Sequence, residues 1–245
     1  MSRYMSIKTA VILAGGLGLR LRPITNKIPK PMVLIRGKPL LEWQMEWLQR
    51  HGVERFVLAT GYMWEKIKDH FDKKELDGIV YSVEDRPLGT AGAIKLAASK
   101  FDDEEFFVLN GDIICNADLG DMARFHREMN SKLTLMVVPF VSPYGMIEIS
   151  GNRVSRFVEK PAIPGLYING GVYLMNREVV RVIPEKGDIE QTTFPKLSEM
   201  GVIYAYRYEG FWRSLDTLKD LKAIEREKVI ADEGSGPDTD LQRKG

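Results

Sequence analysis

The chain has 245 residues and a formal net charge of +1, because 35 lysines and arginines nearly balance 34 aspartates and glutamates. A near-neutral, 44% hydrophobic chain with no long apolar run is typical of a globular protein, so we expect neither nucleic acid nor a membrane as a partner. Its single cysteine excludes an internal disulfide and a cysteine-based zinc site, which predicts a cytoplasmic setting.

Short apolar runs of strand type alternate with helical periodicity over the first 140 or so residues. Strands are expected at residues 10–13, 56–58, 79–81, 106–109 and 133–138. Helices are expected at residues 41–48, at 91–98 with Thr90 as N-cap, and from the N-cap Asp118 to Met129. This alternation predicts βα units on a mostly parallel sheet, an α/β fold.

The pattern changes beyond Pro143. Three strands are expected in succession, at residues 146–149, 154–158 and 170–175, with Gly151-Asn152 as a turn between the first two. A helix at 189–199, a strand at 202–208 and a helix at 217–230 complete the order. We interpret this half as a substrate-binding extension of the first sheet, followed by a disordered tail at residues 231–245.

A glycine-rich loop follows the first predicted strand. Residues 13–23 read Leu-Ala-Gly-Gly-Leu-Gly-Leu-Arg-Leu-Arg-Pro, and Lys30-Pro31-Met32 comes shortly after. Such a loop lets backbone N–H groups approach phosphates. A dinucleotide fingerprint is excluded, because the third glycine, the following helix and the acid about 20 residues on are missing. The P-loop spacing is also absent.

The charge is unevenly distributed along the chain. Residues 1–41 contain eight bases and no acid, which leaves 27 bases against 34 acids in the remainder. Either these are solvated surface charges placed by chance, or the first segment is a basic lobe that receives phosphates.

The chain resembles the sugar-1-phosphate nucleotidylyltransferases over residues 8–230. Besides the glycine loop and Lys-Pro-Met, segments that match the family in order are 87–93, 110–112, 144–145, 159–161 and 169–171. The most similar members are short guanylyltransferases acting on mannose-1-phosphate or heptose-1-phosphate. The resemblance implies a Rossmann-like mixed, mostly parallel sheet flanked by helices, in one domain with a nucleotide half at about 1–140 and a sugar-phosphate half at about 141–230. The C-terminal β-helix of longer relatives is not expected here.

In the implied reaction, a sugar-1-phosphate oxygen attacks the α-phosphorus of an NTP and pyrophosphate leaves. The nucleophile is already an anion, so the site needs positive charge and backbone donors rather than a general base. The resemblance assigns Arg20 and Lys30 as catalytic cations, with Asp112 and Asp216 as ligands of Mg²⁺. Asp216 has an alternative role as the cap of the last helix.

The resemblance places the nucleotide on three loops. The assigned residues are Leu13, Ala14, Gly15, Gly16, Gly18, Glu84, Gly89, Thr90, Asn110 and Gly111. Guanine presents two adjacent donors that suit a carboxylate, so Glu84 favours GTP. A merely charged turn, with UTP, CTP or dTTP as the substrate, is the alternative.

For the sugar phosphate, the resemblance assigns Lys160 to the phosphate and Glu159 to the sugar hydroxyls, with hydrogen bonds from Asn169 and the Gly145 backbone. An exposed strand end is the alternative for Glu159 and Lys160. Two other functions stay open, a catalytically silent NDP-sugar-binding subunit and an acceptor that is a small phosphorylated alcohol. A homodimer also stays open.

The histidines and the cysteine carry no predicted chemistry. His51, His70 and His126 lack a second ligand at metal spacing and are expected at the surface or at helix ends. Cys115 is expected to be a small packed side chain.

Overall fold

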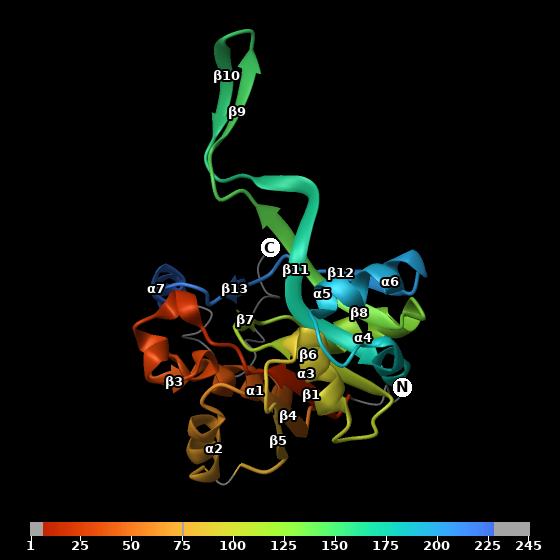
Figure 1. Ribbon diagram of the computed structural model, residues 1–245. Helices are drawn as coiled ribbons and strands as arrows, with labels where there is room; N and C mark the ends of the chain where they lie inside the picture. The colour runs from red at the N-terminus through yellow and green to blue at the C-terminus, as the bar shows by residue number, and fades with distance from the viewer. Residues whose placement is uncertain (1–6, 75, 228–245) are drawn as a thin grey trace, which may run out of the picture.

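A computed structural model of the chain describes residues 7–74 and 76–227, and the predicted tail at 231–245 lies outside them. Its centre is a seven-stranded sheet in the order β12-β8-β11-β6-β1-β4-β5 (Figure 1). β11 is antiparallel to both neighbours, while the other six strands run in one direction. The predicted α/β fold with a mixed, mostly parallel sheet is therefore confirmed. The strands are β1 Thr9–Leu13, β4 Arg55–Thr60, β5 Ile79–Val83, β6 Glu105–Asn110, β8 Leu133–Val141, β11 Ala162–Asn176 and β12 Ile203–Arg207.

Helices cover both faces of the sheet. The seven described α-helices are α1 Leu40–Arg50, α2 Trp64–Asp72, α3 Gly89–Ala98, α4 Leu119–Glu128, α5 Ile189–Thr192, α6 Phe194–Glu199 and α7 Leu218–Arg226. Ile12 of β1 packs into a buried cluster with apolar residues of α1, α2 and α4. Its neighbour Val11 packs into a second cluster, with apolar residues of α3, α5 and α6. Successive side chains of a strand point to opposite faces, so a continuous apolar run fits a strand covered on both sides.

Two helix predictions need correction. Thr90 lies inside α3 rather than before it, and its hydroxyl accepts from Ile189 N and donates to Glu190 Oε2, both at 2.8 Å. The predicted helix at 189–199 is two short helices, and Pro195 lies in the first turn of the second. Proline has no N–H to continue a helix, but it fits a first turn.

Other local predictions are confirmed or corrected by single side chains. Asp118 is the N-cap of α4 and accepts from Gly120 N at 2.8 Å and Asp121 N at 3.1 Å, as predicted. Cys115 is buried as expected. His126 lies in the last turn of α4, a helix end as expected, but it is only 1% exposed, because its ring lies against Thr134 of β8 and Asn176 of β11.

Sequence-distant loops meet at the carboxyl edge of the parallel strands. The loops after β1, β4, β5 and β6 all leave the sheet at this edge, where open α/β sheets bind their ligands. Two short strands, β7 Ile113–Cys115 and β13 Trp212–Ser214, pair antiparallel and bring the chain around residue 216 to the end of β6. Leu215 N donates to Asp112 O at 2.7 Å and fixes this approach.

A two-stranded arm stands clear of the body (Figure 1). It consists of β9 Met146–Ser150 and β10 Arg153–Val158, joined by a turn at Gly151, whose φ is +59°. The predicted turn at Gly151-Asn152 is thus confirmed. The remaining short elements are η1 Leu19–Leu21, η2 Ile24–Asn26, η3 Lys30–Met32, β2 Leu34–Ile35, β3 Lys38–Pro39 and η4 Arg177–Val182. Within residues 7–74 and 76–227, the helices are all too short or too polar to cross a bilayer.

Candidate active site

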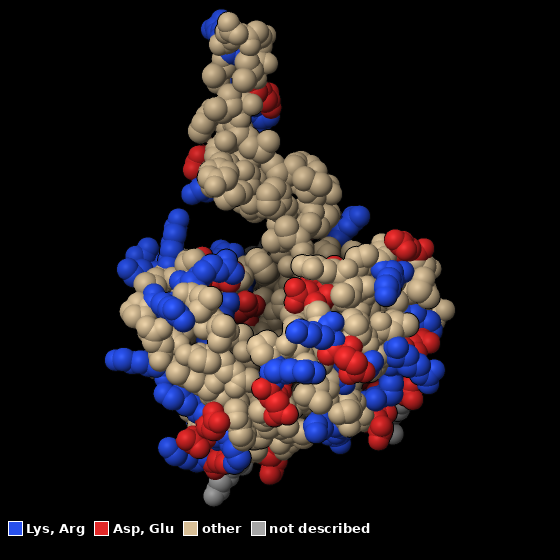
Figure 2. All heavy atoms as spheres, viewed as in Figure 1, with Lys and Arg blue, Asp and Glu red and all other residues tan. Residues whose placement is uncertain are grey.

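A cavity of about 890 Å³ opens at the carboxyl edge of the sheet. Figure 2 shows the body hollowed below the arm, with acidic and basic side chains around the hollow. Loops from both ends of the chain line it, including the glycine loop and the end of β13. The predicted residues among its lining are Leu13, Gly15, Gly16, Gly18, Arg20, Lys30, Glu84, Gly89, Thr90, Asn110, Gly111, Asp112 and Asp216.

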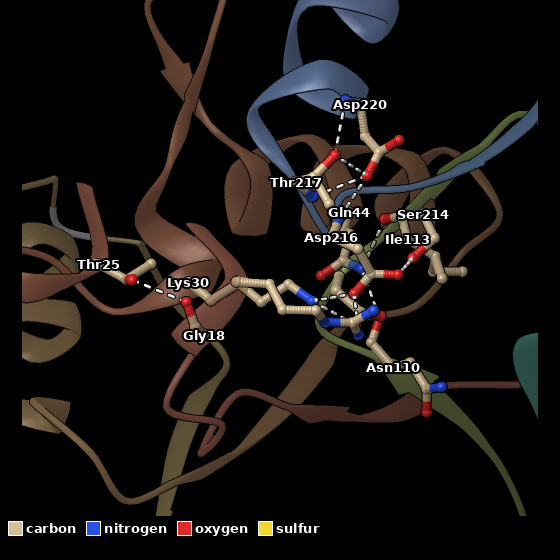
Figure 3. Close-up of polar contacts among 12 residues, drawn as sticks. Gly18, Thr25, Lys30, Gln44, Asn110, Ile113, Ser214, Asp216, Thr217 and Asp220 are labelled. Atoms are coloured by element: carbon tan, nitrogen blue, oxygen red, sulfur yellow. Dashed lines mark hydrogen bonds and ion pairs between the residues drawn. The ribbon is translucent and has the colours of Figure 1, made fainter. Parts of the chain in front are cut away.

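The glycine loop is held in a fixed shape at the mouth of this cavity. Gly18 has φ +61°, and its carbonyl accepts from Thr25 Oγ1 at 2.8 Å (Figure 3). A Cβ at Gly18 would lie 2.9 Å from Thr25 Cγ2, so both conformation and packing require glycine. Gly16 faces open space instead, with nothing within 4 Å of an added Cβ. The loop therefore leaves room beside a backbone that can bind an anion.

One predicted nucleotide residue lies outside the cavity lining. Ala14 is fully buried, and its N–H donates to Ala59 O at 2.7 Å. Because that donor is already used to join β1 to β4, Ala14 supports the loop from below. Its assignment to the nucleotide stays a prediction.

A lysine joins the two predicted metal ligands. Lys30 Nζ lies 2.6 Å from Asp112 Oδ2 and 3.0 Å from Asp216 Oδ1. The Lys30 side chain is only 13% exposed and reaches from the loop side of the cavity toward Asp216 (Figure 3). Residues 82 and 186 positions apart from Lys30 thus meet at one ammonium group. The two carboxylates that sequence alone leaves 104 positions apart share one partner.

Asp216 is held by several donors. Its Oδ1 also accepts from Arg20 Nη2 at 2.8 Å, and its Oδ2 accepts from Ser214 Oγ at 2.8 Å. Burial alone would raise the pKa of Asp216, but hydrogen bonds from Ser214 and Lys30 and the charges of Lys30 and Arg20 outweigh it and lower the pKa below its usual value. Asp216 is therefore an anion at neutral pH.

The alternative role of Asp216 as a helix cap is wrong. Thr217 is the N-cap of α7 and forms a capping box with Asp220 (Figure 3). The Asp216 carboxylate is turned away from the helix toward Lys30 and Arg20. The cap and the candidate ligand are thus adjacent residues with separate functions.

The donor set at this point suits Mg²⁺. Asp112 and Asp216 offer carboxylate oxygens on the wall of an open cavity. No group of three or more His, Cys, Asp or Glu side chains arranged to hold a metal occurs in the described part of the chain. Mg²⁺ is commonly held by one or two protein carboxylates, with water and phosphate oxygens completing its octahedron. Two carboxylates on the wall of the open cavity match that requirement.

Glu84 forms part of the opposite wall, just after β5. Its Oε2 accepts from Leu88 N at 3.0 Å. A Cβ added at Gly61 would lie 2.9 Å from Glu84 Oε1, and one at Gly15 3.3 Å from it. Glycine at both positions therefore lets the carboxylate lie against the loops after β1 and β4. Glu84 shapes the turn and lines the cavity as well, so both of its predicted roles have a geometric basis.

The predicted sugar-phosphate residues do not line this cavity. Gly145 and Glu159 lie together at the base of the arm, where a Cβ at Gly145 would be 2.9 Å from Glu159 Oε2. Lys160, with φ +45°, lies 3.7 Å from Glu159 Oε1, and both side chains are more than half exposed. Asn169 is bound within β11, donating to Tyr173 Oη at 2.7 Å and accepting from Gly171 N at 2.9 Å. The structure groups three of the four at the foot of the arm.

Several lining residues were not among the predicted site residues, and Gly61, Tyr62 and Asp188 are three of them. Gly61 and Tyr62 follow β4 directly, and Asp188 precedes α5. The position of Gly61 at the end of a buried parallel strand was a usable signal. Asp188 had none, because it reaches the cavity only through the packing of residue 187 on α3, where Ala91 N donates to Gly187 O at 2.9 Å.

Comparisons with known proteins agree with this architecture. The chain is 40% identical over 222 residues to mannose-1-phosphate guanyltransferases of Yarrowia lipolytica and Saccharomyces cerevisiae, which covers 86% of this chain. The chain spans only 61% and 62% of the length of these relatives. It is also 32% identical to HddC from Yersinia pseudotuberculosis, solved in complex with GMP-PN, with a TM-score of 0.72 that covers 89% of this chain and 98% of that one.

A family model described as nucleotidyl transferase matches residues 9–228, nearly the range over which the motifs suggested the resemblance. The match takes in the glycine loop, Lys30, Asp112 and Asp216, the residues that the fold brings to one cavity. The chain belongs to the nucleotidyl transferase family.

Proposed function

We propose that the protein joins an NTP, preferably GTP, to a sugar 1-phosphate and releases pyrophosphate. The cluster of Lys30 with Asp112 and Asp216, beside an open glycine loop, carries this proposal. A sugar phosphate is a ready nucleophile, so the protein must bring two polyanions together and stabilise charge on the α-phosphate. The cavity supplies that environment without any histidine or cysteine nucleophile in its lining.

In this proposal the chain's own groups hold the triphosphate. Backbone N–H groups near Gly16 donate hydrogen bonds to its phosphate oxygens from one side, and Arg20 and Lys30 provide positive charge from the other. Lys30 exchanges one of its carboxylate partners for a phosphate oxygen when the nucleotide binds. Gly111, where a Cβ would lie 2.2 Å from Leu13 O, keeps the ends of β1 and β6 close enough for both loops to reach the same substrate.

We propose that Asp112 and Asp216 hold Mg²⁺. When bound, the ion would supply charge stabilisation on the reacting phosphate oxygens. The lowered pKa of Asp216 keeps this carboxylate ionised and able to bind a cation. Arg20 and Ser214 orient it from either side.

Base selection is proposed to rest on Glu84. One of its oxygens is fixed by Leu88 N, which orients the carboxylate against the loops after β1 and β4. Guanine N1–H and N2–H₂ are donors, whereas cytosine presents an acceptor at N3 that a carboxylate would repel. The curated relatives are named guanyltransferases, which supports GTP, and mannose 1-phosphate is the first acceptor to test.

We propose that the two halves of the chain bind the two substrates separately. Residues up to about 140 bind the nucleotide, and residues from about 141 to 230 present Glu159, Lys160, Asn169 and Gly145 to the sugar phosphate. The seven-stranded sheet runs through both halves, which supports one continuous domain. We further propose that the protein acts in the cytoplasm, as a homodimer.

The direct test incubates purified protein with MgCl₂, GTP and mannose 1-phosphate and measures pyrophosphate and nucleotide sugar together. UTP, CTP and dTTP, and glucose-, heptose- and N-acetylhexosamine-type 1-phosphates, complete the matrix. Equal amounts of pyrophosphate and NDP-sugar support the proposal. Binding without turnover for every pair would support the silent subunit instead.

A further inference from the structure

Strand β11 has a break in its register, where it passes from the foot of the arm into the sheet (Figure 1). Asn169 lies opposite Val137 of β8, and Tyr173 lies opposite Leu135, so residues 170–172 lie opposite the single residue 136. Pairing of β11 with β6 on its other side covers residues 172–176. The break is therefore a β-bulge in the middle of the strand, and we call residues 169–171 the bulge segment.

The two glycines of the bulge segment bring the strand close to its neighbours. Gly171 has φ +70°, and a Cβ there would lie 3.0 Å from Asn110 Nδ2. A Cβ at Gly170 would lie 2.9 Å from Met136 O, a backbone atom. Both positions therefore require glycine, and β11 passes directly beside Asn110, which lines the cavity.

Two aromatic side chains hold the bulge segment by hydrogen bonds. Trp212 Nε1 donates to Gly170 O at 2.8 Å. Gly170 is buried and lies in the register break, and a buried carbonyl of this kind needs a donor from elsewhere. Asn169 Nδ2 donates to Tyr173 Oη at 2.7 Å, while Asn169 Oδ1 accepts from Gly171 N at 2.9 Å. These two bonds fix the orientation of the Asn169 amide and leave its second N–H for another acceptor.

The two aromatic residues tie the bulge segment to different parts of the molecule. Tyr173 is fully buried, and its ring centroid lies 5.2 Å from that of Phe194 at the start of α6. Trp212 is the first residue of β13, which ends at Ser214. Ser214 Oγ donates to Asp216 Oδ2 at 2.8 Å. One short strand thus holds both the bulge segment and the carboxylate that we propose as a metal ligand.

We propose that Trp212 and Tyr173 are positioning residues for the sugar 1-phosphate. They fix Asn169 relative to Asp216, so that the phosphate nucleophile is aligned with the α-phosphate of the nucleotide. Neither aromatic residue is among those that line the cavity, so both act through the bulge segment. The substrate assigned to this strand rests on the proposed function, whereas the contacts at the bulge segment do not.

The first test measures KM for each substrate, with the other saturating, in Trp212→Phe and Tyr173→Phe. Each variant keeps an aromatic ring and loses the group that forms the hydrogen bond. KM for mannose 1-phosphate should rise at least about fivefold, because Asn169 is no longer held in place. KM for GTP should stay within about twofold of the wild type, since the glycine loop has its own bond from Thr25 to Gly18.

Matched controls remove the same groups elsewhere in the fold. Trp47→Phe loses the bond from Trp47 Nε1 to Ala117 O at 3.0 Å, and Tyr206→Phe loses the bond from Tyr206 Oη to Asp121 Oδ2 at 2.7 Å. Both controls should keep both KM values. An unchanged KM for mannose 1-phosphate in W212F and Y173F, or an equal rise for both substrates, would overturn the proposal.

A second measurement needs no turnover. The chain has four tryptophans, so the indole N–H signals of ¹⁵N-labelled protein are few and can be assigned by their loss in Trp→Phe variants. Tyr173→Phe should shift the Trp212 signal in ligand-free protein, whereas Tyr206→Phe should not. An unmoved Trp212 signal in Y173F would overturn the proposal even in an active enzyme. If no pair of substrates turns over, the proposed function and the substrate assigned to this strand are both wrong, while a shifted signal still shows that the two aromatic residues hold one segment.

Discussion

Lys30 Nζ lies 2.6 Å from Asp112 Oδ2, so a lysine from the basic N-terminal segment forms an ion pair with a carboxylate that we propose as a metal ligand. The same ammonium group is 3.0 Å from Asp216 Oδ1. With its side chain largely buried between two acids, Lys30 neutralises charge that would otherwise repel in the absence of a divalent cation. In the proposed function, Lys30 and Mg²⁺ would therefore compete for the same carboxylate oxygens until a bound triphosphate pairs with the lysine.

Lys30→Met should separate these two functions. Without the competing ammonium group, Mn²⁺ is expected to bind nucleotide-free protein at least about tenfold more tightly, a change of ~1.4 kcal/mol. Turnover should fall by about 10²- to 10³-fold, because charge stabilisation of the transition state is lost. Titration of Mn²⁺ by electron paramagnetic resonance measures the first effect. Lys27→Met removes an exposed lysine nearby and serves as the control; equal Mn²⁺ affinities in all three proteins would contradict the competition.

Glu84→Gln should change base preference. The amide keeps the size of the side chain and one acceptor but loses the charge that guanine's two donors favour, which is worth about 1.5–3 kcal/mol. We expect kcat/KM for GTP to fall about 10- to 100-fold relative to UTP. Asp85→Asn neutralises the neighbouring acid of the same turn and should leave the ratio unchanged. If the GTP-to-UTP ratio of E84Q matches that of the wild type, Glu84 is only a turn residue.

Two glycines of the site should respond differently to alanine. A Cβ at Gly111 would lie 2.2 Å from Leu13 O, a backbone atom that cannot move aside, so Gly111→Ala should lower the melting temperature by several degrees. Gly16 has nothing within 4 Å, so Gly16→Ala should melt like the wild type. Its methyl group enters the space proposed for phosphate, and KM for the nucleotide should rise. An unchanged KM would remove Gly16 from the proposed phosphate site.

The buried side chain of His126 should make the free energy of unfolding depend on pH, independently of the active site. Its Nε2 lies 2.8 Å from Asn176 Oδ1, an acceptor, and its Nδ1 lies 2.8 Å from the hydroxyl of Thr134, which fits a neutral ring. Burial lowers the pKa of His126 and outweighs the bond to Asn176 and the charge of Glu105, which raise it, while Arg127 and Lys132 lower it further. The unfolded chain therefore takes up a proton first as the pH falls below about 6.5.

Urea unfolding at several pH values measures this linkage. The free energy of unfolding should fall by up to about 1.4 kcal/mol per pH unit below pH about 6.5, until the folded protein also binds the proton. His126→Gln should lose this part of the slope, whereas His51→Gln should keep it. A wild type and an H126Q variant with parallel pH profiles would show that folding does not lower the pKa of His126.

The fold and the main site were predictable where chemistry and local pattern coincide. The apolar run of β1, followed directly by the glycine loop, predicts a strand that is buried on both faces and a ligand-binding site at its carboxyl end. Asp112 follows β6 at the same edge for the same reason. Asp118 capped its helix as expected because N-caps are local.

The features that could not be predicted from the sequence depend on contacts between segments that are far apart along the chain. α2 has only two buried apolar residues, Ile67 and Phe71, too few for a helical period to stand out. His126 is buried through the packing of α4 on the sheet, and Asp188 reaches the cavity through residue 187, neither of which leaves a local pattern. The alternation in the arm predicts strands, but not that they stand clear of the body.

The central claim is tested most directly by incubating the purified chain with GTP, mannose 1-phosphate and MgCl₂ and following pyrophosphate and nucleotide sugar in the same samples. We predict equal amounts of both, dependence on added Mg²⁺, and loss of both in Asp112→Asn and Lys30→Met proteins that melt like the wild type. The absence of pyrophosphate and nucleotide sugar with every NTP and sugar 1-phosphate, or wild-type rates in both variants, would contradict it.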